Sequence, residues 1–154
     1  MTEDVYKRQV LVRWNHPEWG IQPPAEFIPL FEKNGFITPL DHYVWEQACA
    51  VLRKWDGQGI PPIAVSVNVS RADIYDADLC GFLLRTVGKY GLAPERLHLE
   101  ITESAYTKDP EQIIDTVARL RKNGFVIEMD DFGSGYSSLS MLNRMPLDLS
   151  LIHI

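Results

Sequence analysis

Short apolar runs rich in β-branched residues recur along the chain and predict four β-strands. Each run is brief and bounded by polar or turn-forming residues, which is typical of strands buried in a parallel sheet. The predicted strands are Val10–Trp14, Ile63–Asn68, Leu97–Ile101 and Val126–Asp130.

Amphipathic stretches with helical spacing separate these strands. Thr38–Asp41 is typical of a helix start, with Pro39 in the first turn and an acid three residues after the cap. Asp109–Gln112 is a second start, and Gly124 is the expected C-terminal cap of its helix. A third, less regular helix is predicted over Asp73–Tyr90. Alternating strands and helices predict parallel strands with right-handed crossovers, and therefore an α/β sheet or barrel.

Polar residues recur on the predicted strands and at the ends where loops begin. Taken singly, each such residue is more often a helix cap, a solvated loop residue or part of a scaffold ion pair. Four successive strands that all contribute such groups favour a site instead, because ligands bind at this edge of α/β folds. The residues are Arg13 on the first strand, Asn68 at the end of the second, Glu100 and Glu103 at the end of the third, and Asp130 and Asp131 at the end of the fourth.

The chemistry of this set indicates divalent cations. Carboxylate and amide oxygens favour Mg²⁺ or Mn²⁺ over Zn²⁺. The adjacent Asp130 and Asp131 are able to serve two ions, as in two-metal hydrolysis of phosphate esters. The Asp-Phe-Gly triplet at 131–133 is not interpreted as a kinase motif, since the sequence has neither a glycine-rich nucleotide loop nor a kinase catalytic loop.

Composition excludes some classes of protein. A formal net charge of −6 and the absence of a basic stripe argue against binding to a nucleic acid polymer. Cys49 and Cys80 are interpreted as buried free thiols of a reducing compartment. The sequence has neither an apolar run of about 18 residues nor a signal peptide, so we expect a cytoplasmic protein.

The remaining ionisable residues give weaker indications. His16, His42 and His98 lie away from the polar strand ends, and surface or packing roles are expected for them. Alternation places Glu128 on the same strand face as Asp130. Glu128 is therefore expected to enter the interior, either as a supporting hydrogen-bond acceptor or as a buried carboxylate with a raised pKa.

Five segments in order resemble the EAL domain, a bacterial phosphodiesterase of the second messenger cyclic di-GMP. They are LVRWNHPEWG (11–20), FIPLFEKNGFI (27–37), SVNVS (66–70), LEITES (99–104) and DDFGSGYSSL (130–139). The resemblance covers residues 10–148 and implies part of a TIM-like (β/α)8 barrel, with about five strand–helix units present. It also implies hydrolysis of cyclic di-GMP to linear pGpG with Mg²⁺ or Mn²⁺, in a two-ion site.

The resemblance assigns a role to each matching position. Glu100, Asp130 and Asp131 match catalytic residues, and the same three residues match metal ligands together with Asn68. Arg13 and Glu32 match residues of the substrate site, and Glu103 matches the anchor of the loop at 131–138. By the same resemblance, we expect a homodimeric parent protein, in a family whose domains often sit beside GGDEF or sensory domains.

The chain departs from the family pattern near both ends. Gln9 occupies the position of a family glutamate that binds metal, which weakens its assignment as a ligand. After Pro146–Asp148 the expected lysine and second aspartate are absent. We therefore expect residues 1–9 and 149–154 to be foreign to a partial EAL domain at 10–148, and the chain alone to be poorly stable or inactive. A degenerate EAL domain that binds cyclic di-GMP as a receptor without cleaving it is the alternative.

Overall fold

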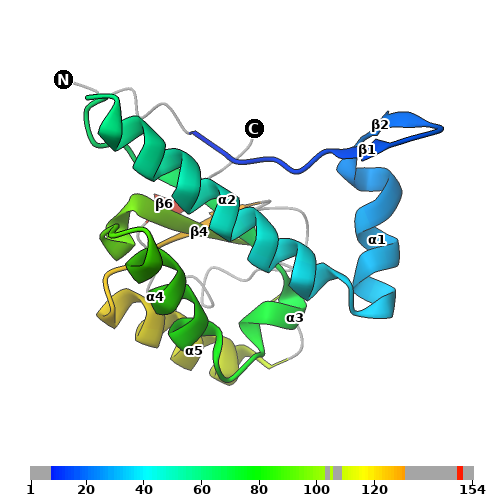
Figure 1. The fold of residues 1–154 in the computed structure, drawn as a ribbon. Helices are drawn as coiled ribbons and strands as arrows, with labels where there is room; N and C mark the ends of the chain where they lie inside the picture. The colour runs from blue at the N-terminus through cyan, green and yellow to red at the C-terminus, as the bar shows by residue number, and fades with distance from the viewer. Residues whose placement is uncertain (1–7, 103–104, 106–108, 131–148, 151–154) are drawn as a thin grey trace.

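The computed structural model describes residues 8–102, 105, 109–130 and 149–150 (Figure 1). The elements in chain order are β1 (Trp14–His16), β2 (Gly20–Gln22), α1 (Pro24–Asn34), α2 (Ile37–Gly57), β3 (Val65–Val69), α3 (Arg71–Ile74), α4 (Leu79–Lys89), a 3₁₀ turn η1 (Pro94–Arg96), β4 (Leu97–Thr102), α5 (Pro110–Lys122), β5 (Val126–Asp130) and β6 (Leu149–Ser150). None of the helices in these described ranges is long and apolar enough to cross a membrane.

The main sheet is parallel and follows the order of the chain. Its strand order is β3-β4-β5-β6, so each strand lies beside the one that precedes it. Gln9 adds a parallel bridge to Ser66 at the free edge of β3. Two backbone hydrogen bonds support that bridge, from Val10 N to Ser66 O at 2.9 Å and from Ser66 N to Arg8 O at 2.8 Å. The resulting arrangement of adjacent parallel segments is that of a barrel wall.

The two faces of this sheet differ sharply in polarity. One face carries apolar side chains at alternate positions, and α2, α4 and α5 pack against one another in that order over it. Its fully buried strand residues include Val67, Leu99 and Ile127, which are register partners across β3, β4 and β5. Because side chains alternate along a strand, the residues between them lie on the opposite face, which is polar.

Helix α5 starts and ends as the sequence predicts, whereas the start of α2 matches the prediction only in part. The Asp109 carboxylate accepts a hydrogen bond from Gln112 N at 3.2 Å and caps α5. Gly124 follows the end of that helix with φ +96°, a conformation that glycine adopts without strain. Helix α2 begins at Ile37, so Pro39 lies in its first turn as predicted, where its missing N–H costs nothing. The predicted cap at Thr38 is wrong, because Thr38 lies inside the helix and the residue that precedes the helix, Phe36, caps it without a side-chain hydrogen bond.

Two sequence-based assignments are wrong. The single helix expected over Asp73–Tyr90 is two helices, α3 and α4. The cause is a polar turn, in which Asp76 Oδ1 accepts a hydrogen bond from Asp78 N at 2.9 Å. The strand expected over Val10–Trp14 is also absent: only the bridge at Gln9 joins the main sheet there.

The N-terminal part instead forms a small unit of its own. Trp14 begins β1, which pairs with β2 in an antiparallel hairpin whose Gly20 has φ +70°. Helix α1, which the hydrophobic pattern did not predict, follows that hairpin and is capped after Asn34 by Gly35 with φ +78°. Figure 1 shows α1 leading into the start of α2, with the hairpin at the other end of α1, away from the four-stranded sheet.

Candidate functional site

The polar face of the main sheet brings together most of the described candidate residues. Asn68 on β3, Glu100 on β4 and Glu128 on β5 are register partners, so they form one row across three strands. Ser66 and His98 form the row that precedes it along the strands. The expectation that Asn68 and Glu100 lie together at the sheet edge is therefore met by the strand register.

Glu100 is the most enclosed carboxylate of this row, with only 1% of its surface exposed. Its Oε2 accepts a hydrogen bond from Gln9 Nε2 at 2.9 Å. Buried carboxylates need such partners, because an ionised group inside a protein loses its hydration. The side-chain amide of Gln9 thus donates a hydrogen bond directly to a candidate metal ligand.

Glu128, which is 3% exposed, is held by two partners on different strands. Ser66 Oγ donates to Glu128 Oε2 at 2.8 Å, which spans the width of β4, and His98 Nδ1 lies 2.8 Å from Glu128 Oε1. Of the two roles left open by the sequence, the structure supports the hydrogen-bond acceptor. His98 was expected to have a surface or packing role, and its contact with Glu128 in the interior is a polar one that the sequence did not indicate.

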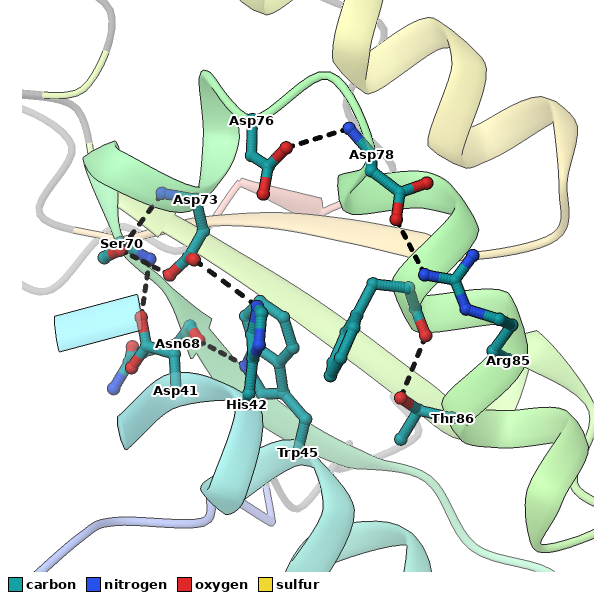
Figure 2. Close-up of polar contacts among 11 residues, drawn as sticks. Asp41, His42, Trp45, Asn68, Ser70, Asp73, Asp76, Asp78, Arg85 and Thr86 are labelled. Atoms are coloured by element: carbon teal, nitrogen blue, oxygen red, sulfur yellow. Dashed lines mark hydrogen bonds and ion pairs between the residues drawn. The ribbon is translucent and has the colours of Figure 1, made fainter. Parts of the chain in front are cut away.

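Asn68 lies at the C-terminal end of β3 with its side chain exposed. Its backbone carbonyl accepts a hydrogen bond from Trp45 Nε1 at 2.9 Å (Figure 2). Two residues further on, Ser70 N donates to Asp41 Oδ2 at 3.2 Å. Helix α2 therefore contacts the backbone on both sides of residue 69.

Asp41 belongs to a buried polar cluster that sequence reasoning missed. Asp41 is 8% exposed and Asp73 is fully buried. Burial, which is the largest cause, together with a hydrogen bond and charge repulsion from Asp73, raises the pKa of Asp41 to about 8. Ser70 Oγ donates to Asp73 Oδ2 at 2.5 Å, and His42 Nε2 lies 3.8 Å from Asp73 Oδ1 (Figure 2). The sequence signal was that acids occupy apolar-facing positions, Asp41 shortly after the first turn of α2 and Asp73 in α3.

The other predicted site residues do not belong to the row of Asn68, Glu100 and Glu128. Arg13 is exposed and precedes β1 rather than lying on a sheet strand, and its guanidinium donates to Val12 O at 2.9 Å. Glu32 is exposed on α1. Asp130 is the last residue of β5, paired in register with Thr102. Asp131 and Glu103 lie outside the described residues.

The chemistry of the described residues is compatible with a hard divalent cation. Asn68 and Glu100 offer an amide and a carboxylate oxygen from paired positions on neighbouring strands, and such donors suit Mg²⁺ or Mn²⁺. Within the described ranges, no three His, Cys, Asp or Glu side chains lie close enough together to hold a metal ion. The described row thus offers an amide and a carboxylate oxygen at neighbouring positions, and no larger group of such side chains is found in this part of the chain.

Comparison with known proteins identifies the family. The family model described as EAL domain matches residues 1–154, and the chain belongs to that family. It is 42% identical, over 91% of its length and 17% of the relative's, to an uncharacterized signaling protein of Caulobacter vibrioides. It is 40% identical, over 94% of its length and 18% of the relative's, to the cyclic di-GMP phosphodiesterase NbdA of Pseudomonas aeruginosa.

Solved structures show the same fold. The phosphodiesterase PaMucR, in its c-di-GMP complex, superposes with a TM-score of 0.86 at 35% identity, over 92% of this chain and 57% of PaMucR. The EAL enzyme Bd1971, in a form with cAMP and cyclic di-GMP bound, has a TM-score of 0.86 at 29% identity, over 94% of this chain and 40% of Bd1971. The predicted partial TIM-like barrel of the EAL type is thereby confirmed. The chain spans less than a fifth of the length of the two curated relatives named above.

Proposed function

We propose that this chain is part of a metal-dependent phosphodiesterase, and that the parent protein hydrolyses cyclic di-GMP to linear pGpG. The observation that carries the proposal is the row of Asn68 and the buried Glu100 at paired positions of parallel strands in an EAL domain. The similarity to NbdA and to PaMucR supports the substrate class, since both are described as cyclic di-GMP proteins.

The proposed roles follow from position and chemistry. Asn68, Glu100, Asp130 and Asp131 would hold Mg²⁺ or Mn²⁺, with Arg13 and Glu32 at the substrate and Glu103 anchoring the loop at 131–138. A divalent ion bound there supplies a Lewis acid for the phosphodiester and lowers the pKa of a water molecule. Glu100 is suited to its role because the fixed hydrogen bond from Gln9 and its burial limit the directions in which its carboxylate points.

Hydrolysis by the full-length protein tests this proposal. Cyclic di-GMP is incubated with the protein and Mn²⁺, with or without excess EDTA, and pGpG is measured by chromatography. We expect Mn²⁺-dependent formation of pGpG that falls by at least about 100-fold in Glu100→Gln, since a charged ligand is lost. Glu95→Gln is the matched control, because Glu95 is exposed on η1 and lies away from the polar row.

Two results would contradict the proposal. One is turnover that survives removal of divalent ions, and the other is equal activity of the Glu100 and Glu95 variants. Binding of cyclic di-GMP with no pGpG under any metal condition would favour a receptor instead.

The receptor is a second candidate because of one observation. Gln9 places an amide donor on Glu100 Oε2, at a position where the family motif has a metal-binding carboxylate. A neutral donor there reduces the negative charge available to an ion. The receptor hypothesis predicts that Gln9→Glu restores or increases hydrolysis in the full-length protein, whereas an already competent enzyme changes little.

A further inference from the structure

Helix α2 contacts the end of β3 through two hydrogen bonds that bracket residue 69, and we call these the α2–β3 contacts. The first joins Trp45 Nε1 to the carbonyl oxygen of Asn68 at 2.9 Å. The second joins Ser70 N to Asp41 Oδ2 at 3.2 Å. Figure 2 shows both side chains directed from α2 toward this short piece of backbone.

Both contacts come from enclosed side chains with little freedom to move. Trp45 is fully buried, in the core beneath the sheet, and Asp41 is 8% exposed. An indole buried to that degree is held by packing on all sides, so its single N–H has one available direction. The position of the Asn68 backbone is therefore set from the outer, helical side of the sheet.

Asp41 is itself oriented by the cluster around Asp73. Ser70 uses both its groups: its N–H binds Asp41, and its hydroxyl donates to Asp73 Oδ2 at 2.5 Å. The same hydroxyl oxygen accepts from Asp73 N at 3.3 Å and caps α3. These bonds connect α2, the end of β3 and the start of α3, and thereby fix the backbone that follows Asn68.

Unlike the enclosed side chains of Trp45 and Asp41, the Asn68 side chain is exposed, on the polar face of the sheet. Its direction depends on the backbone angles of its own strand end, because the side chain is exposed. A metal ligand of this kind gains precision from the groups that hold its backbone, as outer partners of metal sites generally do.

We propose that Trp45 and Asp41 are positioning residues that hold the end of β3 so that the Asn68 side chain keeps the orientation needed for a divalent cation. Neither residue touches substrate or metal, and both act through the backbone at 68–70. The inference rests on the proposed function, because it requires Asn68 to be a ligand.

Conservative and disruptive substitutions separate positioning from plain stability. Trp45→Phe removes the N–H and keeps most of the aromatic packing, and Trp55→Phe on the same helix is its control. Asp41→Ala removes the acceptor of Ser70 N, whereas Asp41→Asn keeps an acceptor oxygen there. Asn68→Ala reports whether Asn68 is a ligand at all.

Two measurements are made on the full-length protein, in addition to thermal unfolding. Mn²⁺ affinity is determined by calorimetric titration, and amide hydrogen exchange is followed at Ser70. We expect Trp45→Phe and Asp41→Ala to raise the Mn²⁺ dissociation constant about 10-fold, while Asp41→Asn and Trp55→Phe leave it within about twofold. Exchange at Ser70 is expected to rise at least about 10-fold in Asp41→Ala and to stay protected in Asp41→Asn.

The outcomes distinguish this inference from the proposed function. If the unaltered protein binds no Mn²⁺, or Asn68→Ala binds it normally, the metal role of Asn68 fails and this inference fails with it. If Asn68→Ala weakens binding but Trp45→Phe and Asp41→Ala do not, the inference alone is overturned. The same holds if Trp55→Phe weakens Mn²⁺ binding as much as Trp45→Phe, since the effect would then be general loss of stability.

Discussion

Glu100 and Glu128 are register partners on adjacent parallel strands, with both carboxylates on the polar face and each almost completely buried. Two neighbouring buried carboxylates repel each other unless other groups compensate. Here hydrogen bonds draw them to different partners: Gln9 at the sheet edge binds Glu100, while Ser66 and His98 bind Glu128. The hydrogen bond from Gln9 thus joins the segment beside β3 to the row formed by Asn68, Glu100 and Glu128.

Gln9→Glu is the substitution that tests this coupling. It replaces the amide donor with a carboxylate facing Glu100 Oε2, so without divalent ions we expect a loss of about 1–3 kcal/mol in the free energy of unfolding. With Mn²⁺ the added negative charge favours binding, and a tenfold tighter site returns about 1.4 kcal/mol at saturation. Urea unfolding with EDTA and with excess Mn²⁺ measures both effects.

Gln22→Glu is the matched control for that substitution. Gln22 Nε2 also donates one hydrogen bond, to Trp19 O at 2.8 Å, but in the exposed hairpin rather than beside a carboxylate. The free energy of unfolding of the Gln22→Glu variant is expected to be independent of Mn²⁺. An equal response to Mn²⁺ in the two variants would show that Gln9 has no special relation to a metal site.

The raised pKa of Asp41 leads us to expect a specific pH dependence of the free energy of unfolding. Burial raises its pKa to about 8 in the folded chain, from an ordinary value of 3.8. Between these two values the folded state binds a proton that the unfolded state has lost, so the free energy of unfolding decreases as pH rises from about 4 to about 8. For a single proton the slope is at most about 1.4 kcal/mol per pH unit.

Asp41→Asn isolates this contribution because asparagine is neutral at every pH. Unfolding is measured in urea at intervals from pH 4 to pH 9 for both proteins. The difference in stability between the variant and the unaltered chain is expected to grow in favour of the variant up to about pH 8, and then to stay constant. A difference that is the same at all pH values would mean that Asp41 is ionised in the folded state at neutral pH.

Local interactions made much of this fold predictable from sequence. Asp109 is recognisable as a cap because its partner, Gln112 N, is three residues away. The apolar runs at β3, β4 and β5 predicted the strands nearly to their ends, and alternation placed Glu128 in the interior. Parallel order then followed from the helices between those strands.

The features that were missed depend on contacts distant in sequence. Trp45 and Asn68 are 23 residues apart, and Ser66 and Glu128 are 62 residues apart, so their pairing requires the register of the folded sheet. The sequence also could not show that Gln9 would donate to Glu100, 91 residues away. Arg13 was placed on a sheet strand because its apolar neighbours resemble one, but the hairpin of β1 and β2 competes for that region.

The two cysteines provide a simple test of core integrity. Cys49 and Cys80 are free and buried, as the sequence predicted. Burial raises the pKa of the Cys49 thiol to about 11, with the charge of Glu46 adding to the effect, and burial also raises the pKa of Cys80. A thiol rather than a thiolate is a poor nucleophile, so at pH 8 the folded chain is expected to react slowly with a disulfide reagent.

In the Cys80→Ala variant the remaining thiol is that of Cys49, which reports on the core beneath α2. Its reaction with the reagent is expected to be at least about 100-fold slower in buffer than in denaturing urea, since the core must open first. Absorbance of the released thiol reagent measures both rates. Rapid reaction in buffer would show that Cys49 is accessible, contrary to its complete burial.

Two Arg–Asp pairs with similar closest N···O distances are expected to differ in their contribution to stability. Arg96 Nη2 lies 2.9 Å from Asp56 Oδ1, and Arg85 Nη2 lies 2.7 Å from Asp78 Oδ2. The Arg96 side chain is 16% exposed, whereas that of Arg85 is 65% exposed. Exposed ion pairs contribute little because water competes with them, and a forked pair shielded from water contributes more.

Arg96 also joins three parts of the fold. Its second guanidinium nitrogen, Nη1, donates to Asp56 Oδ2 at 3.2 Å at the end of α2, and its Nε donates to Ile63 O at 2.5 Å before β3. We therefore expect Arg96→Ala to lower the urea midpoint of unfolding severalfold more than Arg85→Ala does. Arg96→Lys is expected to be intermediate, because lysine keeps the charge but loses the fork. Equal losses for the two alanine variants would contradict the assignment of Arg96 as the link between the end of α2 and the start of β3.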